Sequence, residues 1–259
     1  MRYFTATHEE LDWPLPGFME PVSTVPAGDG VTDLGERFPE LAGRGVELGE
    51  YATLFGVRRL LQESWREDGP PAADEMVGIS HYRRFAVTRP TGTQTFLVGE
   101  VTSRVFADLP DDLFLPPPGA IMVPALVDFG GSVQGFYAHH QPVRDLLHFM
   151  GLAVDLGVVD DRSVADFLSG HRMMPTASVS VVPASWLVAT LEQLERVAEA
   201  FGATVATPRE GYQRRARGFC CEWLHGMLLG QLLSGWPADR VIMNRALLVS
   251  PEPPHRPGS

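Results

Sequence analysis

The chain has 259 residues, 44% of them hydrophobic, which is enough to bury one large α/β core. Its formal net charge of -11 argues against a nucleic-acid binder, because contact with a polyanion needs a basic surface. All 21 residues in the Lys and Arg count are arginines, and the absence of lysine excludes a P-loop and any pyridoxal phosphate or Schiff-base chemistry.

The sequence has no pattern of a membrane span or of an export signal. No apolar run approaches the roughly 18 to 20 residues that a bilayer requires, and the N-terminal residues lack the sections of a signal peptide. Cys220 and Cys221 are adjacent in an apolar helical pattern, which is typical of core thiols rather than of a disulfide framework or a metal knuckle. We therefore expect a cytoplasmic protein without a membrane span.

The first predicted element is a strand that leads into a functional loop. Residues 2–7 are partly β-branched and aromatic, which predicts an opening strand that ends at Thr7 and His8. Residues 13–45 are rich in proline, glycine and acidic side chains, without clear periodicity. They predict a long ordered loop over one end of the sheet.

The next two elements bring a polar segment to the edge of the sheet. Apolar positions on two stripes predict a helix over residues 47–65, and the turn of glycine and prolines at 69–71 ends it. The short apolar run 76–80 then predicts an inner strand that presents His81 at its carboxyl end. Ligands of open α/β sheets bind at such ends.

The second half of the chain continues the alternation of strands and helices. Three further strands are predicted over residues 95–101, 120–123 and 178–182. Helical spacing over 134–156 is broken by Pro142, and two more helices are predicted over 184–201 and 218–233. The last helix is apolar nearly all round and should be buried, whereas residues 240–249 fit either a strand or a short helix.

These elements predict an α/β fold with a mixed central sheet flanked by helices. We find neither an internal repeat nor a linker, so we expect a single domain over residues 1–249. The proline-rich residues 250–259 predict a disordered tail.

The segment after the inner strand carries the clearest chemical signal. His81 and Tyr82 are followed by Arg83 and Arg84, which places an imidazole, a phenol and two guanidinium groups at the mouth of the sheet. Guanidinium groups match phosphate oxygens in pairs, so the segment predicts a site for a diphosphate. The alternative is a solvated turn whose arginines pair with nearby carboxylates.

Residues 78–85, GISHYRRF, also resemble a family signature that has the form Gly-Leu-Cys-His-Tyr-Arg-Arg-Tyr. The family occurs in bacterial capsular and exopolysaccharide gene clusters, was long catalogued as a domain of unknown function, and is regarded as GT-A-like glycosyltransferases. Further motifs follow in the family's order across about residues 2–235. They are Thr7-His8, Glu47-Leu48, Tyr137 with His139 and His140, and the late segment with Tyr212, Gln213, Arg215, Gly218, Phe219, Glu222 and Leu224.

Three positions depart from the family pattern. Arg37 stands where the family has an asparagine, Trp223 replaces an arginine after Glu222, and Glu9 replaces a lysine after His8. These departures bear on the donor sugar and the acceptor more than on the fold.

The resemblance implies a GT-A-like, Rossmann-type domain that transfers a sugar from a nucleotide-sugar. We expect a UDP-linked hexose or N-acetylhexosamine as the donor, and a hydroxyl or amine of a small natural product or glycan as the acceptor. Tyr137, His139 and His140 are the expected acceptor contacts. The expected donor contacts are Thr7, His8, Asp33, Glu36, His81, Tyr82, Arg83, Arg84 and Arg215.

The expected catalytic residues are Glu222 and His81. Direct displacement needs a base within hydrogen-bond reach of the acceptor, and Glu222 lies in an apolar helix where an unpaired carboxylate is strongly unfavourable. Arg215 or Arg217 would supply its partner, although the same pairing fits a structural ion pair. The other candidate bases are Asp33, Glu36, His139 and His140.

The sequence has no Asp-x-Asp at a predicted strand end to hold a divalent cation under the diphosphate. Two arginines can neutralise that charge instead, so we expect transfer without a metal or other cofactor, with a divalent cation as the alternative. Two other functions stay open: a non-catalytic module that binds nucleotide-sugars, and a nucleotide-sugar hydrolase.

Overall fold

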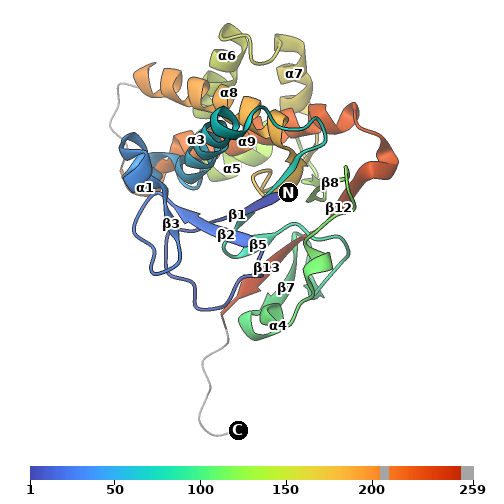
Figure 1. Ribbon diagram of the computed structural model, residues 1–259. Helices are drawn as coiled ribbons and strands as arrows, with labels where there is room; N and C mark the ends of the chain where they lie inside the picture. The colour runs from blue at the N-terminus through green and yellow to red at the C-terminus, as the bar shows by residue number, and fades with distance from the viewer. Residues whose placement is uncertain (205–209, 252–259) are drawn as a thin grey trace, which may run out of the picture.

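The computed structural model describes residues 1–204 and 210–251. Most of the predicted tail over 250–259 lies outside the described residues. Figure 1 shows the long helices gathered along one side of a mixed sheet, with β7 (Val98–Thr102), β13 (Ala246–Ser250) and the short helix α4 (Ser103–Ala107) toward the other end. The predicted fold class, an α/β fold with a mixed central sheet flanked by helices, is confirmed.

The first four strands of the chain pair in parallel and form one part of the sheet. They are β1 (Arg2–Ala6), β2 (Met19–Ser23), β3 (Thr32–Asp33) and β4 (Met76–His81). β1 lies between β2 and β4 and pairs with both, while β2 also pairs with β3. Gly78 of β4 lies opposite Tyr3 of β1, and a Cβ on Gly78 would stand 2.2 Å from the Tyr3 ring. Glycine is therefore needed where this ring covers the strand.

Antiparallel pairing extends the sheet on the other side of β4. β11 (Ser180–Pro183) lies between β4 and β8 (Ile121–Pro124), and β12 (Val241–Asn244) pairs with β8 in parallel. β9 (Val127–Asp128) and β10 (Arg172–Met173) form a separate pair.

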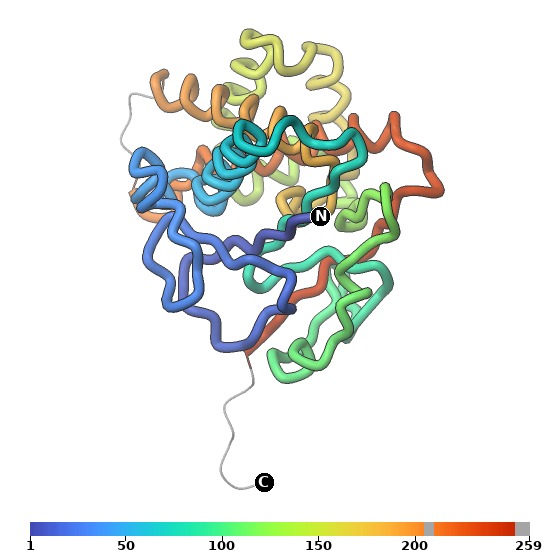
Figure 2. The backbone as a smooth tube through the Cα atoms, in the orientation of Figure 1, coloured from blue at the N-terminus to red at the C-terminus, as the bar shows by residue number. Residues whose placement is uncertain are grey.

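A branch of the sheet leaves the end of β4. Its strands are β5 (Arg84–Phe85), β13 (Ala246–Ser250), β7 (Val98–Thr102) and β6 (Thr93–Gln94). β13 pairs with both β5 and β7, so the last described strand joins the segment 81–85 to the hairpin β6–β7. Figure 2 shows the red C-terminal strand beside this green segment of the chain.

Long helices cover the sheet, with α8 at the centre of their contacts. They are α3 (Tyr51–Asp68), α5 (Val133–His140), α6 (Val143–Asp155), α7 (Asp161–Ser169), α8 (Ala184–Thr204) and α9 (Ala216–Ser234). α8 packs against α3, α6 and α9. Cys220 and Cys221 of α9 are fully buried, as the sequence predicts.

Short elements account for most differences from the sequence predictions. Residues 13–45 are not one loop, since they contain β2, β3, α1 (Leu34–Arg37) and a 3-10 turn at Pro39–Leu41. The helix predicted over 47–65 is divided into α2 (Gly45–Leu48) and α3. Gly49 separates them with φ 59 and ψ -136, a conformation that only glycine adopts readily. Residues 240–249 lie largely in strands, β12 and β13.

Candidate functional site

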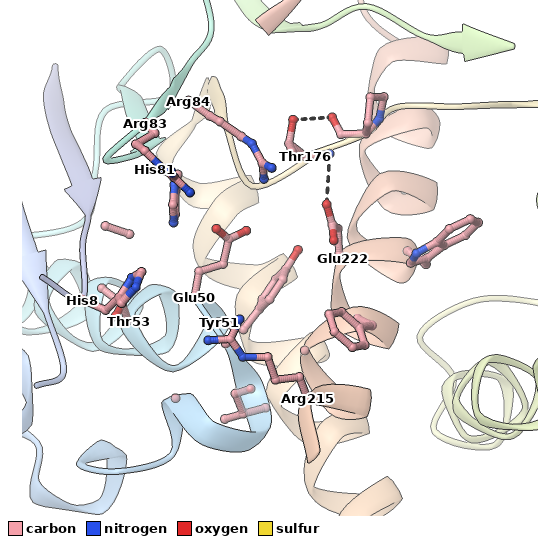
Figure 3. A pocket seen from close by; sticks show the side chains of 18 of the residues that line it. His8, Glu50, Tyr51, Thr53, His81, Arg83, Arg84, Thr176, Arg215 and Glu222 are labelled. Carbon is pink, nitrogen blue, oxygen red and sulfur yellow. Dashed lines mark hydrogen bonds between the residues drawn. The ribbon is translucent and has the colours of Figure 1, made fainter. Parts of the chain in front are cut away.

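A cavity of about 920 Å³ opens where the parallel strands β1, β2 and β4 end. Residues that follow each of these strands line it, which is the position expected for a ligand of an open α/β sheet. Figure 3 shows His8 and Thr53 toward one end and Thr176 with Glu222 toward the other, with Glu50 between them. Ten of the predicted site residues line the cavity: Thr7, His8, His81, Tyr82, Arg83, Arg84, Tyr137, His140, Arg215 and Glu222.

Three other predicted residues lie outside the lining. The Asp33 carboxylate caps α1 by accepting from the N–H groups of Gly35 and Glu36 at 2.8 and 3.0 Å. The Glu36 side chain is exposed on that helix. His139 is exposed on α5, with its Nδ1 2.7 Å from the carbonyl oxygen of Gly135.

Arginines give the cavity a cationic side. Arg83, Arg84 and Arg215 all line it, and within residues 1–204 and 210–251 none of them has a carboxylate oxygen within 4.0 Å. The guanidinium carbon of Arg83 lies 5.1 Å from the centre of the Tyr82 ring. These groups are therefore available to bind an anion, and the solvated ion-paired turn considered from sequence does not form among the described residues.

Two carboxyl groups face this cationic side. Glu50 stands at the start of α3, where its carboxyl accepts a short hydrogen bond from the Ser178 hydroxyl. Glu222 lies on α9, and its Oε1 accepts from the backbone N–H of Thr176 at 3.2 Å. Thr176 has φ 55, which is uncommon outside glycine, so the loop bends sharply to present this N–H.

The pKa values of both carboxyls are raised. Burial raises the pKa of Glu222 to about 7, the negative charge of Glu50 adds to the rise, and Arg84 and the Thr176 N–H oppose it. Burial also raises the pKa of Glu50, against the hydrogen bond from Ser178 and the charges of Arg84 and Arg215. Near pH 7 the Glu222 carboxyl is therefore poised to take up or release a proton.

Neither of the two ion pairs suggested for Glu222 forms among the described residues. The Arg217 guanidinium lies 2.9 Å from a carboxylate oxygen of Glu47, and Gly202 leaves room for it. Arg215 is exposed at the edge of the cavity, where it acts on Glu50 through its charge. Glu222 is thus held by a backbone N–H rather than by an arginine fork.

His81 is neutral at physiological pH. Burial lowers its pKa to about 3, and the nearby charges of Arg84, His8, Arg83 and Arg215 act in the same direction. Its Nδ1 is buried without a hydrogen-bond partner among the described residues. A neutral imidazole can donate through one nitrogen to a ligand oxygen, which is a binding role rather than a cationic one.

Glu50 and Tyr51 line the cavity without being predicted from the sequence. The Tyr51 hydroxyl lies 3.1 Å from Nδ1 of the buried His225, whose pKa is lowered to about 4 by burial. Burial raises the pKa of Tyr51 well above its usual value, together with the charges of Glu222 and Glu50. The sequence signal that could have pointed to Glu50 and Tyr51 is Gly49. A glycine inside a helical pattern can mark the point where one helix ends and the next begins.

A solved glycosyltransferase resembles this structure. No protein-family model and no curated protein matches the chain. The apo structure of WbbM, described as a bifunctional glycosyltransferase, matches 96% of this chain with a TM-score of 0.71 and 14% sequence identity. The chain therefore shares its fold with the matched part of that glycosyltransferase. It spans 45% of the WbbM chain that it matches, so the likeness concerns one part of that protein.

Neither a membrane-spanning helix nor a metal-binding cluster occurs in the described part of the chain. Over residues 1–204 and 210–251, no helix combines the length and the apolar character that crossing a bilayer needs. The same residues contain no group of three or more His, Cys, Asp or Glu side chains arranged to hold a metal ion.

Proposed function

We propose that the protein is a glycosyltransferase that uses a nucleotide-sugar donor. The observation that carries this proposal is the cavity wall on which Arg83, Arg84 and Arg215 lack carboxylate partners among the described residues and face Glu50 and Glu222. Guanidinium groups bind a diphosphate, while a carboxylate of raised pKa accepts a proton. Sugar transfer from a nucleoside diphosphate by direct displacement can use both functions. The fold shared with a known glycosyltransferase supports this choice.

The donor would occupy the end of the cavity beside the parallel strands. Thr7 and His8 follow β1, and Thr24 follows β2, which offers hydroxyl and imidazole groups to a nucleoside. Arg83 and Arg84 would then bind the diphosphate, with neutral His81 as a further hydrogen-bond donor. The proposed donor is a UDP-linked hexose or N-acetylhexosamine, and the acceptor is a hydroxyl or amine of a small natural product or glycan.

Glu222 is the proposed general base. The acceptor oxygen or nitrogen forms a bond to the anomeric carbon while the bond from that carbon to the diphosphate oxygen breaks. The acceptor proton passes to the Glu222 carboxylate, and the nucleoside diphosphate leaves with its added negative charge against the arginines. Burial, with a further contribution from the negative charge of Glu50, raises the Glu222 pKa to about 7, which suits acceptance of this proton near neutral pH.

We also propose that this charge neutralisation does not require a divalent metal. The support is the set of guanidinium groups on the cavity wall, whose charges are fixed at any accessible pH. Turnover should then persist when the protein is assayed in EDTA. Turnover that EDTA abolishes and manganese restores would overturn the proposal.

The decisive test is donor binding. Calorimetry with UDP-, GDP-, dTDP- and CMP-sugars should show tight binding of one nucleotide class to the wild-type protein. Arg83→Ala should weaken it by about 10- to 100-fold, because a charged hydrogen-bond donor is lost. Arg89→Ala is the matched control, since Arg89 is exposed and paired with Asp112 away from the cavity.

Two outcomes would overturn the transferase function. If no nucleotide-sugar binds, the protein has no donor among these compounds and the proposed function is rejected. Binding followed only by release of free sugar in the presence of acceptors would identify a hydrolase, and chromatography of the products distinguishes this case.

A further inference from the structure

Aromatic side chains form one side of the cavity near Glu222. The aromatic wall consists of Phe129, Phe136, His140 and Trp223, all of which line the cavity. The rings of Phe129 and Phe136 stack with centroids 3.8 Å apart and an angle of 17° between their planes. Phe136 lies 4.8 Å from the His140 ring and 6.2 Å from the Trp223 ring, centroid to centroid.

Separate elements hold these rings in place. Phe129 follows β9, and its N–H donates to the carbonyl of His171 at 3.1 Å. Phe136 lies on α5, and Trp223 lies on α9 next to Glu222. The three rings therefore come from distant segments of the chain that meet at this wall.

Several polar groups on this side of the cavity already have partners. The Tyr137 hydroxyl contacts the Cys220 sulfur at 3.5 Å, and the Gln141 Oε1 accepts from the Gln213 amide at 3.0 Å. The Thr176 hydroxyl donates to the carbonyl of Pro175 at 2.6 Å. A sugar ring placed here would bury several hydroxyl groups with few partners, and each such group carries a desolvation cost.

Apart from Glu222, which adjoins the wall, the arginines of the β4 end and Glu50 lie on other parts of the lining. Arg83 and Arg84 come from the end of β4, and Glu50 lies at the start of α3. Trp223 adds an uncharged ring to the lining on this turn of α9. The aromatic wall thus fits an uncharged, flat ligand better than an anionic or highly hydroxylated one.

We propose that the acceptor is a planar aromatic molecule with a hydroxyl group. Its ring would lie against Phe136 and Trp223, and its hydroxyl would reach the neighbouring Glu222 carboxylate. The inference rests on the proposed transferase function, because in that function Glu222 accepts the proton of the acceptor hydroxyl. It narrows the acceptor from natural products or glycans in general to phenols and related fused-ring compounds.

The test measures acceptor binding separately from donor binding. The phenol probes are 1-naphthol, 4-methylumbelliferone and quercetin, and the carbohydrate probes are methyl glucoside, cellobiose and N-acetyllactosamine. Calorimetry with the wild-type protein should show saturable binding of at least one phenol and no binding of the carbohydrates at equal concentration. Phe136→Leu should weaken phenol binding by about three- to tenfold, since a stacking partner is lost while apolar volume is largely kept.

Controls separate loss of stacking from loss of structure. Phe96→Leu is the matched variant, because Phe96 is 66% exposed and lies outside the cavity lining. It should leave phenol affinity unchanged. If Phe136→Leu unfolds, Trp223→Phe tests the same wall with a smaller ring. Donor affinity should stay unchanged in every variant of the wall.

The results distinguish this inference from the proposed function. Carbohydrate probes that bind more tightly than the phenols, or phenol affinity unchanged in both wall variants, would overturn the aromatic acceptor. Donor binding that depends on Arg83, without any phenol binding, would overturn it while leaving the transferase function intact. Phenol binding that depends on Phe136, without any donor binding, would retain the aromatic site and reject the transfer.

Discussion

Glu222 holds its proton more tightly than an ordinary glutamate, and this single property couples activity to stability. Its pKa in the folded protein is about 7, above the usual value of 4.5. The folded state therefore binds more protons than the unfolded state between these values, so the stability contributed by this group falls as the pH rises from about 4.5 to 7. The same ionisation produces the carboxylate that the proposed reaction needs.

Glu222→Gln should lower the activity and remove the pH-dependent loss of stability that comes from Glu222. Transfer at saturating substrate should fall by about 10²- to 10⁴-fold, because the proton acceptor is lost, while calorimetry should show unchanged donor affinity. The melting temperature should rise by a few degrees at pH 8 and by much less at pH 5, since the variant removes a buried charge present only at the higher pH. Equal activity in the variant and the wild type would exclude Glu222 as the base.

Glu50→Gln tests the coupling between the two carboxyls. The negative charge of Glu50 helps to raise the pKa of Glu222, and glutamine can still accept the hydrogen bond from Ser178. The acidic limb of the kcat profile should therefore shift to lower pH in this variant. A profile whose midpoint stays in place, with only its height reduced, would show that Glu50 acts in some other way.

The glycine between α2 and α3 determines where a residue of the candidate site stands. Gly49 ends α2 with a positive φ and directs the chain so that Glu50 begins α3 beside the arginines. A Cβ at Gly49 would have no atom within 4 Å, so a side chain there would strain the backbone without a steric clash.

Gly49→Ala should therefore destabilise the fold by about 1 to 3 kcal/mol through the backbone alone. Urea unfolding measures this change. Gly17→Ala is a matched control, because its Cβ also meets no atom within 4 Å and its φ is not positive. A free energy of unfolding that is the same for both variants would contradict the assigned role of Gly49.

The sequence predicts some of these elements well and misses others for physical reasons. The strand before His81 and the buried last helix follow from apolar runs, and both are confirmed. β2 escapes prediction because Pro21 lies in its middle and cannot donate a backbone hydrogen bond, which normally argues against a strand. The position of Glu50 is not predicted, because the apolar periodicity continues across Gly49 and indicates one unbroken helix. The aromatic wall depends on contacts between distant segments, which no local pattern reveals.

Two histidines, the partly buried His81 and the fully buried His225, make the fold as a whole sensitive to acid. His81 and His225 have pKa values of about 3 and 4, below the usual 6.5. The unfolded chain binds protons at these residues below pH 6.5 while the folded protein does not. Their contribution to stability is therefore complete above pH 6.5 and is lost as the pH falls toward 4.

His225→Gln should reduce this loss. Glutamine can retain a hydrogen bond to the Tyr51 hydroxyl but does not titrate, so the variant should lose less stability than the wild type between pH 6.5 and pH 4.5. Denaturant unfolding at several pH values gives the comparison. Parallel pH dependences for the two proteins would show that His225 does not contribute to the acid sensitivity.

The pairing of β13 with β5 also has a consequence for biosynthesis. Arg84 pairs with Leu248, and the carbonyl of Arg83 accepts from the N–H of Val249 at 2.9 Å. The arginines proposed to bind the donor are thus anchored by a strand that comes much later in the chain. During synthesis β1 can pair with β4 before β13 has left the ribosome, and the arginine segment then lacks this anchor. We therefore expect donor binding only after residues 246–250 have been released.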